Sequence, residues 1–186
     1  MIIAGIDVGY RNIDKYYIFK GVIMYYIYDS DKLVDKRIEI SKKEAYLDSM
    51  YDVDRYRVEL ERELADRAVA DYILIDGHLD SRFFSIRNRT NRFWIPKRVE
   101  TQEIYIDSDI IVRTFGKEGF RYRIETFPDN RDSLESLIKL LNTSAIIYPF
   151  ILAEADRFSI VKDREIPFNL KLLVLTGKVH RRLLRR

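Results

Sequence analysis

Two short apolar runs in the first half of the chain each end in an aspartate. Residues 2–6 lead into Asp7, and residues 72–75 lead into Asp76. Apolar runs of this length, bounded by charged residues and glycine, are typical of buried strands. The sequence therefore predicts two interior strands, each of which delivers a carboxylate at its C-terminal end.

A predicted β-meander and a helix lie between these two strands. Residues 16–19 and 22–28 are rich in aromatic and β-branched side chains and flank a Lys-Gly pair at 20–21, which predicts a hairpin. In residues 53–70, apolar positions recur at intervals of four with charges between them, which indicates an amphipathic helix. We expect three strands and then this helix before the Asp76 strand.

The second half of the chain predicts further strands and two helices around them. A capping-box pattern indicates a helix that begins near residue 132, and Pro149 fits the first turn of a helix that runs to about residue 160. Further strands are expected at residues 104–106, 110–115, 120–127 and 145–148. This order predicts one α/β domain, residues 1–186, with a mixed sheet flanked by helices.

Composition narrows the possible chemistry. The 186 residues include no cysteine, which excludes disulfides, thiolate zinc sites and cysteine nucleophiles. The net charge is only +3, so a nucleic-acid role has to be argued from where the charges lie. There is no long apolar run and no signal-peptide pattern, so we expect a cytoplasmic protein. Abundant charge and a single glutamine are typical of proteins that work at high temperature.

The acidic residues at the strand ends suggest a metal site. Two strands of one sheet can place Asp7 and Asp76 side by side, and oxygen ligands suit the divalent cations that act on phosphates. The helix between them offers Glu59, Glu61 and Glu63, and spacing alone does not choose among these three. The alternative is that each aspartate begins a turn and that the glutamates form a solvated charged face.

Four short blocks of the chain carry a resemblance: residues 6–11, 57–60, 71–79 and 148–156. In this order they resemble the successive motifs of the NurA family, nucleases that work with the HerA hexameric translocase in DNA end resection. The resemblance implies an RNase H-like fold, a manganese- or magnesium-dependent site that hydrolyses DNA phosphodiesters with two metal ions, a homodimer, and a HerA-like ATPase partner. It makes DNA the expected substrate.

The resemblance also implies roles for individual residues. Carried over position by position, Asp7, Glu59 and Asp76 would bind the metal, with Tyr148 close to the site. Where the family has a histidine this chain has Asp156, which restores the Asp-Glu-Asp-Asp set of RNase H-like enzymes and would act as a fourth ligand. The chain is also shorter than typical NurA proteins.

A basic segment between residues 82 and 98 interleaves arginines with aromatic rings, a combination that suits phosphates and bases of single-stranded nucleic acid. The expected nucleic-acid-binding residues are Arg11, Arg82, Arg87, Arg89, Arg92 and Trp94. The alternative is that the aromatic side chains belong to the core and the arginines are merely solvated.

Two other functions compete with the nuclease. Residues 5–9 also resemble the first phosphate loop of actin-like ATPases and sugar kinases, but the chain has no room for the second loop and the adenosine site. A non-catalytic NurA-like DNA-binding or assembly subunit is the other alternative, supported by Asp156 and by the short length. Retention of the principal carboxylates argues against it, because clustered acids repel one another without a cation.

Overall fold

The computed structural model describes residues 1–30, 32–79, 90–97, 104–106, 110–117, 120–143 and 149–175. The strands are β1 (Ile2–Ile13), β2 (Tyr16–Asp29), β3 (Lys32–Tyr46), β4 (Tyr72–Asp76), β5 (Arg92–Ile95), β6 (Ile104–Ile106), β7 (Ile111–Lys117) and β8 (Phe120–Thr126). The helices are α1 (Met50–Arg67), α2 (Arg131–Thr143), α3 (Phe150–Ser159) and α4 (Phe168–Leu175), with 3-10 turns η3 (Pro128–Asn130) and η4 (Asp163–Glu165).

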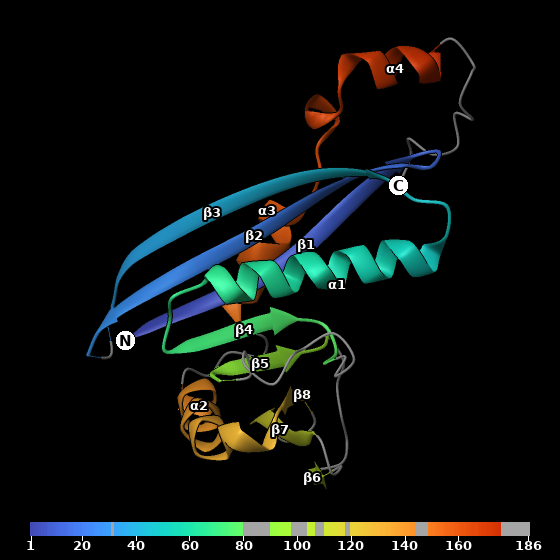
Figure 1. Ribbon diagram of the computed structural model, residues 1–186. Coiled ribbons are helices and arrows are strands. Elements are labelled where there is room, and N and C mark those ends of the chain that lie inside the picture. Colours follow the sequence, from blue (N-terminus) through green and yellow to red (C-terminus); the bar gives the residue numbers. More distant parts are fainter. Residues whose placement is uncertain are drawn as a thin grey trace.

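Within the described residues the strands form one eight-stranded sheet in the order β3-β2-β1-β4-β5-β8-β7-β6 (Figure 1). β1 pairs in parallel with β4, and β4 with β5, whereas β1, β2 and β3 form an antiparallel meander. The long connection that includes α1 lets β4 return parallel to β1, as parallel pairing requires. This confirms the predicted α/β class with an RNase H-like mixed sheet flanked by helices.

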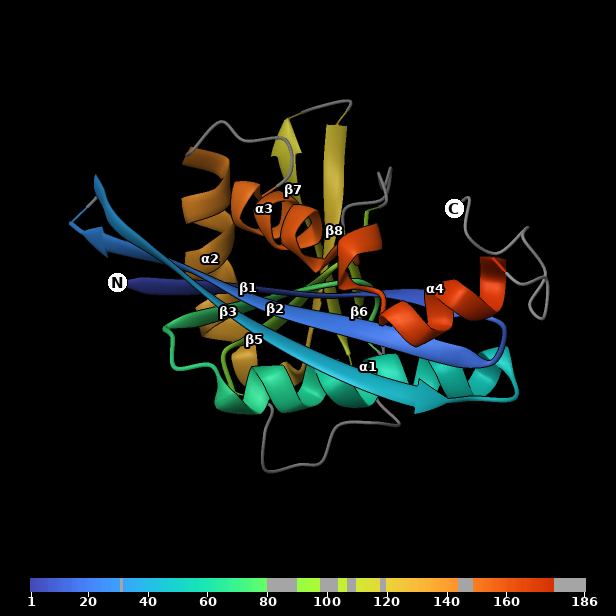
Figure 2. The ribbon, with the colours of Figure 1, turned by 90° about the horizontal axis from the view of Figure 1, so that it is seen from above.

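The helices cover both faces of the sheet (Figure 2). On one face α1 buries Val53, Leu60 and Leu64 against β1, β2 and β4. On the other face α3 packs on β1, β2 and β4 and α2 packs on β7, through a second apolar cluster that includes Leu137 and Leu152. Because the central strands are buried on both sides, they are almost continuously apolar in sequence.

The predicted hairpin at residues 20–21 is wrong, because β2 continues straight through Gly21. The chain instead reverses at Asp14, whose φ of 56° is the left-handed conformation of a tight turn. A side chain on Gly21 would place its Cβ 2.6 Å from Leu64 Cδ1 of α1. This glycine therefore serves the close approach of a helix to the sheet, not a turn.

Several other elements differ from the sequence-based expectation. β3 extends the meander over 15 residues and forms the edge of the sheet, where charged side chains prevent further pairing. β5 lies inside the basic segment between residues 82 and 98, where no strand was expected, and α4 was not expected either. α3 begins directly after Pro149 as predicted, while the strand expected at 145–148 lies outside the described residues.

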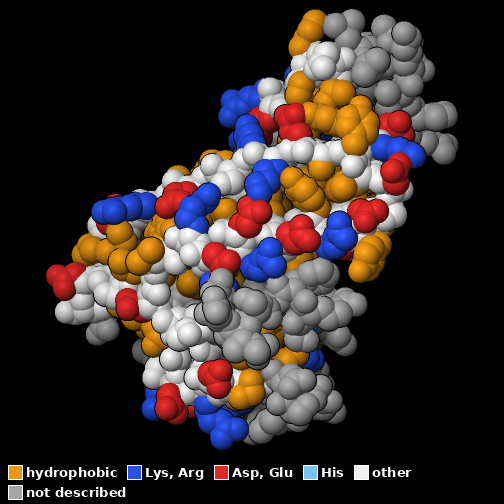
Figure 3. Space-filling model, in the orientation of Figure 1, with side chains coloured by type: hydrophobic (Ala, Val, Ile, Leu, Met, Phe, Trp, Pro, Cys, Tyr) orange, Lys and Arg blue, Asp and Glu red, His pale blue; other side chains and the backbone are white. Residues whose placement is uncertain are grey.

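The face formed by α1 and β3 carries basic and acidic side chains intermixed (Figure 3). Lys43 pairs with Glu63 and Arg67 pairs with Glu39, so the charges of the helix and the edge strand neutralise one another. A search of the described helices finds none long and apolar enough to cross a membrane.

Candidate functional site

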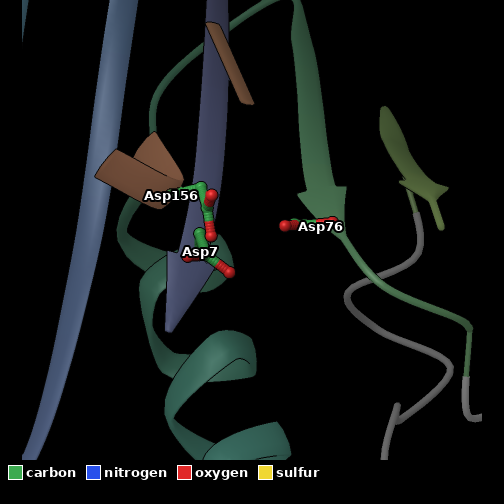
Figure 4. Close-up of side chains that lie close together, drawn as sticks. All are labelled: Asp7, Asp76 and Asp156. Atoms are coloured by element: carbon green, nitrogen blue, oxygen red, sulfur yellow. The ribbon is translucent and has the colours of Figure 1, made fainter. Parts of the chain in front are cut away.

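The site begins where two parallel strands separate. The pairing of β1 with β4 ends at Ile6 and Ile75, and the next residue of each strand is an aspartate. Asp7 and Asp76 are therefore neighbours at the point of divergence, and both are buried, with 7% and 8% of their surface exposed. Figure 4 shows the Asp76 side chain directed from the tip of β4 toward Asp7.

The third carboxylate, Asp156, comes from α3, which runs very close to β1. A Cβ on Gly9 would lie 2.5 Å from the carbonyl oxygen of Ser159, so only glycine permits this approach. Because α3 approaches β1 so closely, the Ser159 hydroxyl reaches Asp7 and donates a hydrogen bond to its carboxylate. The helix thereby brings an oxygen of Asp156 within 4.8 Å of oxygens of Asp7 and Asp76.

Lys97 bridges two of these carboxylates. Its Nζ lies 2.7 Å from Asp76 Oδ2 and 3.0 Å from Asp156 Oδ1. Burial lowers the pKa of Lys97, but the hydrogen bonds to Asp76 and Asp156 outweigh burial, so the pKa is raised. The ammonium group stays charged at neutral pH and lies between two of the three carboxylates. No sequence pattern indicated this role for Lys97.

The Asp7 carboxyl is held in an unfavourable environment for a charge. Burial raises its pKa above 3.8, the hydrogen bond from Ser159 lowers it, and the charges of Asp76 and Asp156 raise it further. Lys97 offsets only part of this increase. A carboxylate kept buried beside two others is typical of functional sites.

On α1 the structure brings Glu61 toward the site, and not Glu59. The side chain of Glu59 is 42% exposed and pairs with Arg55 at 3.7 Å, whereas Glu61 is buried and Asp7 and Asp76 act on its charge. Residues two positions apart on a helix differ by about 200° in direction, so both cannot face the sheet. The structure therefore does not bring Glu59 to Asp7 and Asp76, and Glu61 is the glutamate of α1 whose charge those two residues affect.

Glu61 gives the metal-free protein a specific pH dependence. Burial raises the pKa of Glu61 to about 8, Arg57 opposes this, and Asp7 and Asp76 raise it further. Because the folded pKa exceeds the unfolded value of 4.5, the contribution of this group to stability is complete below pH 4.5 and is lost as the pH rises through about 8.

We therefore expect Glu61→Gln to flatten the fall in unfolding free energy between pH 4.5 and 8 in EDTA. Urea denaturation at several pH values measures this. Glu63→Gln, on the exposed side of α1, is the control and should leave the slope unchanged. Parallel curves for the parent protein and Glu61→Gln would show that Glu61 ionises normally.

The other expected site residues have mixed outcomes. Arg92 and Trp94 are 6% and 1% exposed in β5, and Arg92 pairs with Asp66 at 2.6 Å, so neither is placed to contact nucleic acid. For Trp94 the core alternative is confirmed. Arg11 lies near the site, where it pairs with Asp163 at 2.6 Å. The remaining candidates lie outside the described residues: Arg82, Arg87, Arg89 and Tyr148.

The carboxylates lie in a cleft of about 900 Å³. β1 continues for seven residues beyond its last pair with β4, so its free edge forms one wall. The N-terminal half of α1 and the end of α3 contribute the other walls. A cleft of this size suits a ligand comparable to a small molecule or a short piece of a polymer.

Comparison with solved structures identifies two nucleases with the same fold. The NurA nuclease from Sulfolobus solfataricus matches with a TM-score of 0.54 and 15% identity, over 95% of this chain and 83% of that one. Endonuclease V from Bacillus subtilis matches with the same TM-score, identity and coverage. No protein-family model matches the sequence, and no curated protein matches it significantly. The chain therefore shares the fold of NurA and Endonuclease V.

Proposed function

We propose that the protein is a metal-dependent DNA nuclease that hydrolyses phosphodiester bonds at Asp7, Asp76 and Asp156. The observation that carries this proposal is the convergence of three carboxylates from β1, β4 and α3 within 4.8 Å. The shared fold with two nucleases supports it. DNA end processing is the cellular role that the NurA resemblance suggests.

The residues fit a divalent cation. The donors are hard carboxylate oxygens, which suit magnesium or manganese. Lys97 Nζ, within 3.0 Å of two of these carboxylates, shows that the cluster already attracts positive charge at this point. Asp7, Asp76 and Asp156 would hold the ion, with Glu61 beside them. A bound divalent cation supplies an activated water at neutral pH and stabilises charge on the leaving oxygen.

The surrounding residues position these ligands. The Ser159 hydroxyl orients Asp7 through its hydrogen bond. The close packing of α3 on Gly9 sets the distance between Ser159 and β1. Lys97 is half exposed on the cleft side, so when it leaves the carboxylates its ammonium group can contact a phosphate of the substrate. The chain thus provides both the anionic ligands and a cation for the substrate.

A specific observation favours a second candidate, a non-catalytic DNA-binding or assembly subunit with this fold. Lys97 forms ion pairs with two of the three carboxylates, Asp76 and Asp156, and so offsets their negative charge without any metal. A tethered ammonium can stabilise an acidic cluster that has lost its catalytic ion. Such a subunit would bind DNA and leave it intact in every metal.

Cleavage of labelled single- and double-stranded DNA in manganese, magnesium or EDTA distinguishes the two candidates. We expect cleavage in manganese or magnesium, none in EDTA, and a loss of at least about a thousandfold in Asp76→Asn, since a metal contributes several kcal/mol to such reactions. Asp48→Asn is the matched control, because Asp48 is an exposed acid that pairs with Lys15. Intact DNA in all metals would leave the non-catalytic candidate.

Homodimerisation and docking on a HerA-like ATPase belong to this proposal through the family resemblance alone. The hydrolysis proposed above requires neither of them, because all three carboxylates come from one chain.

A further inference from the structure

The cleft extends well beyond the carboxylates, and its far part has a different chemistry. At the α1 end it is lined by two tyrosines and two arginines: Tyr10, Tyr51, Arg55 and Arg57. The acidic part and this aromatic, basic part belong to one continuous cavity. A ligand whose reacting group lies at the carboxylates therefore extends toward the tyrosines.

Tyr10 is a rigid aromatic surface. Its ring lies 5.9 Å from that of Tyr17 and 5.7 Å from that of Phe19, so two rings of β2 support it from one side. Tyr10 nevertheless remains 39% exposed. A ring fixed from behind and open in front loses little conformational entropy when a flat ligand stacks on it.

Tyr51 belongs to the first turn of α1. The Tyr17 hydroxyl approaches Met50 Sδ at 4.0 Å, which places the first turn of α1 next to the ring that supports Tyr10. Tyr51 is 64% exposed and also lines the cleft. Two accessible rings therefore flank the same end of the cavity.

The arginines provide positive charge without strong internal partners. Arg55 reaches Glu59 only at 3.7 Å, and Arg57 reaches Glu61 only at 3.8 Å. The Nε of Arg57 is buried and has no hydrogen-bond partner among the described residues. Both guanidinium groups are available for phosphates.

We propose that the α1 end of the cleft is a base-stacking subsite for an unpaired nucleotide next to the scissile phosphate. Tyr10 and Tyr51 stack on its base, and Arg55 and Arg57 bind the adjoining phosphates. The inference rests on the proposed nuclease function and specifies its substrate as a strand with unpaired bases. A cleft of about 900 Å³ is large enough for a short piece of one strand.

Asp54, which also lines this part of the cleft, agrees with this arrangement. A carboxylate repels phosphate but accepts hydrogen bonds from the amino groups of a base. It therefore favours a base, and not the backbone, between the two tyrosines.

The test is binding of a fluorescent single-stranded oligonucleotide in EDTA, where no turnover occurs, measured by anisotropy. Tyr10→Leu and Tyr51→Leu should each weaken binding about tenfold, because a stacked base contributes about 1–3 kcal/mol. Tyr10→Phe and Tyr51→Phe keep the ring and should bind within about twofold of the parent. Phe150→Leu is the matched control, since Phe150 is a 62% exposed aromatic residue outside the cleft.

An oligonucleotide with abasic positions separates stacking from a general defect. It should bind the parent about tenfold more weakly, and the leucine variants should lose little more, because the same contact is already absent. The proposal is overturned if the parent does not bind the single strand, if the leucine variants bind as the parent does, or if the losses simply add.

Failure of this inference and failure of the nuclease proposal give different results. Tyrosine-dependent binding without cleavage in any metal would support the base-stacking subsite and reject the nuclease function. The opposite result would be cleavage that is lost in Asp76→Asn and binding that is unaffected by both leucine variants. It would support the nuclease function and reject the base-stacking subsite.

Discussion

Asp7→Asn is expected to abolish DNA cleavage and yet raise the Tm of the protein in EDTA. The carboxylate is buried, and its pKa is raised first by that burial and then by Asp76 and Asp156. A folded pKa above 3.8 means that the contribution of Asp7 to stability is complete below pH 3.8 and is lost as the pH rises through the folded value. At pH 7 the charged group therefore destabilises the fold, and asparagine removes that cost.

The size of the activity loss should be at least about a thousandfold, since several kcal/mol of metal-dependent stabilisation disappear. Cleavage assays in manganese and thermal unfolding in EDTA measure the two effects on the same preparation. Asp163→Asn is the control for stability, because Asp163 is 81% exposed. A lower Tm for Asp7→Asn would mean that Asp7 stabilises the fold as an ordinary structural acid.

The second large effect is expected from Glu165→Gln, which lies outside the carboxylate cluster. Lys20 is buried in β2, and its Nζ lies 3.1 Å from Glu165 Oε1 of η4. Lys42 of β3 pairs with the same oxygen at 2.6 Å. Removing Glu165 leaves the Lys20 charge buried without its anion, which costs about 3 kcal/mol of unfolding free energy.

This cost should depend on pH. Burial raises the pKa of Glu165, but Lys42, the backbone N–H of Lys162 and Lys20 lower it to about 2. The stability that Glu165 contributes is therefore present above its unfolded pKa of 4.5 and is lost as the pH falls toward 2.

Guanidinium denaturation of the parent and Glu165→Gln should differ by about 3 kcal/mol at pH 7 and by progressively less below pH 4.5. The control is Glu154→Gln, in a pair with Lys36 that is about 40% exposed and should contribute less than about 1 kcal/mol. Equal stability of the parent and Glu165→Gln at pH 7 would contradict the prediction.

The positions of Asp7 and Asp76 could be predicted from sequence because each follows a continuous apolar strand. Parallel central strands are buried on both faces and are therefore continuous apolar runs in sequence. The first charged residue after each run marks the end of the strand. Asp156 was named from the NurA resemblance, and Pro149 predicted only the helix that carries it. The placement of Asp7 and Asp76 depends on local pattern plus one rule of sheet topology.

The choice of Glu61 over Glu59 needed tertiary structure, although a signal existed. Both glutamates flank the apolar stripe that contains Leu60 and Leu64. Val53 and Ala65, which are eight and four residues from Glu61, are also buried. The buried face of the helix therefore extends to the side on which Glu61 lies. The spacing of four along the helix did not distinguish the two sides, and Glu59 was named from the NurA resemblance.

The edge strand β3 and Lys97 could not be found by the same approach. β3 is exposed over most of its length, so it lacks the apolar pattern that identifies a strand. Lys97 follows a four-residue strand, and its partners are 21 and 59 residues away in sequence. Nothing in its own neighbourhood distinguishes it from a solvated lysine.

The ammonium group of Lys97 acts on its carboxylates as an intramolecular competitor. Any divalent ion that binds Asp76 and Asp156 has to displace a cation tethered to β5, whose effective concentration does not change when the solution is diluted. The apparent Kd for the ion then equals its intrinsic Kd divided by the fraction of molecules in which Lys97 has left. If the three carboxylates hold the divalent ion proposed above, Lys97 weakens its binding, and a higher concentration of free metal is needed to occupy the site than the carboxylates alone would require.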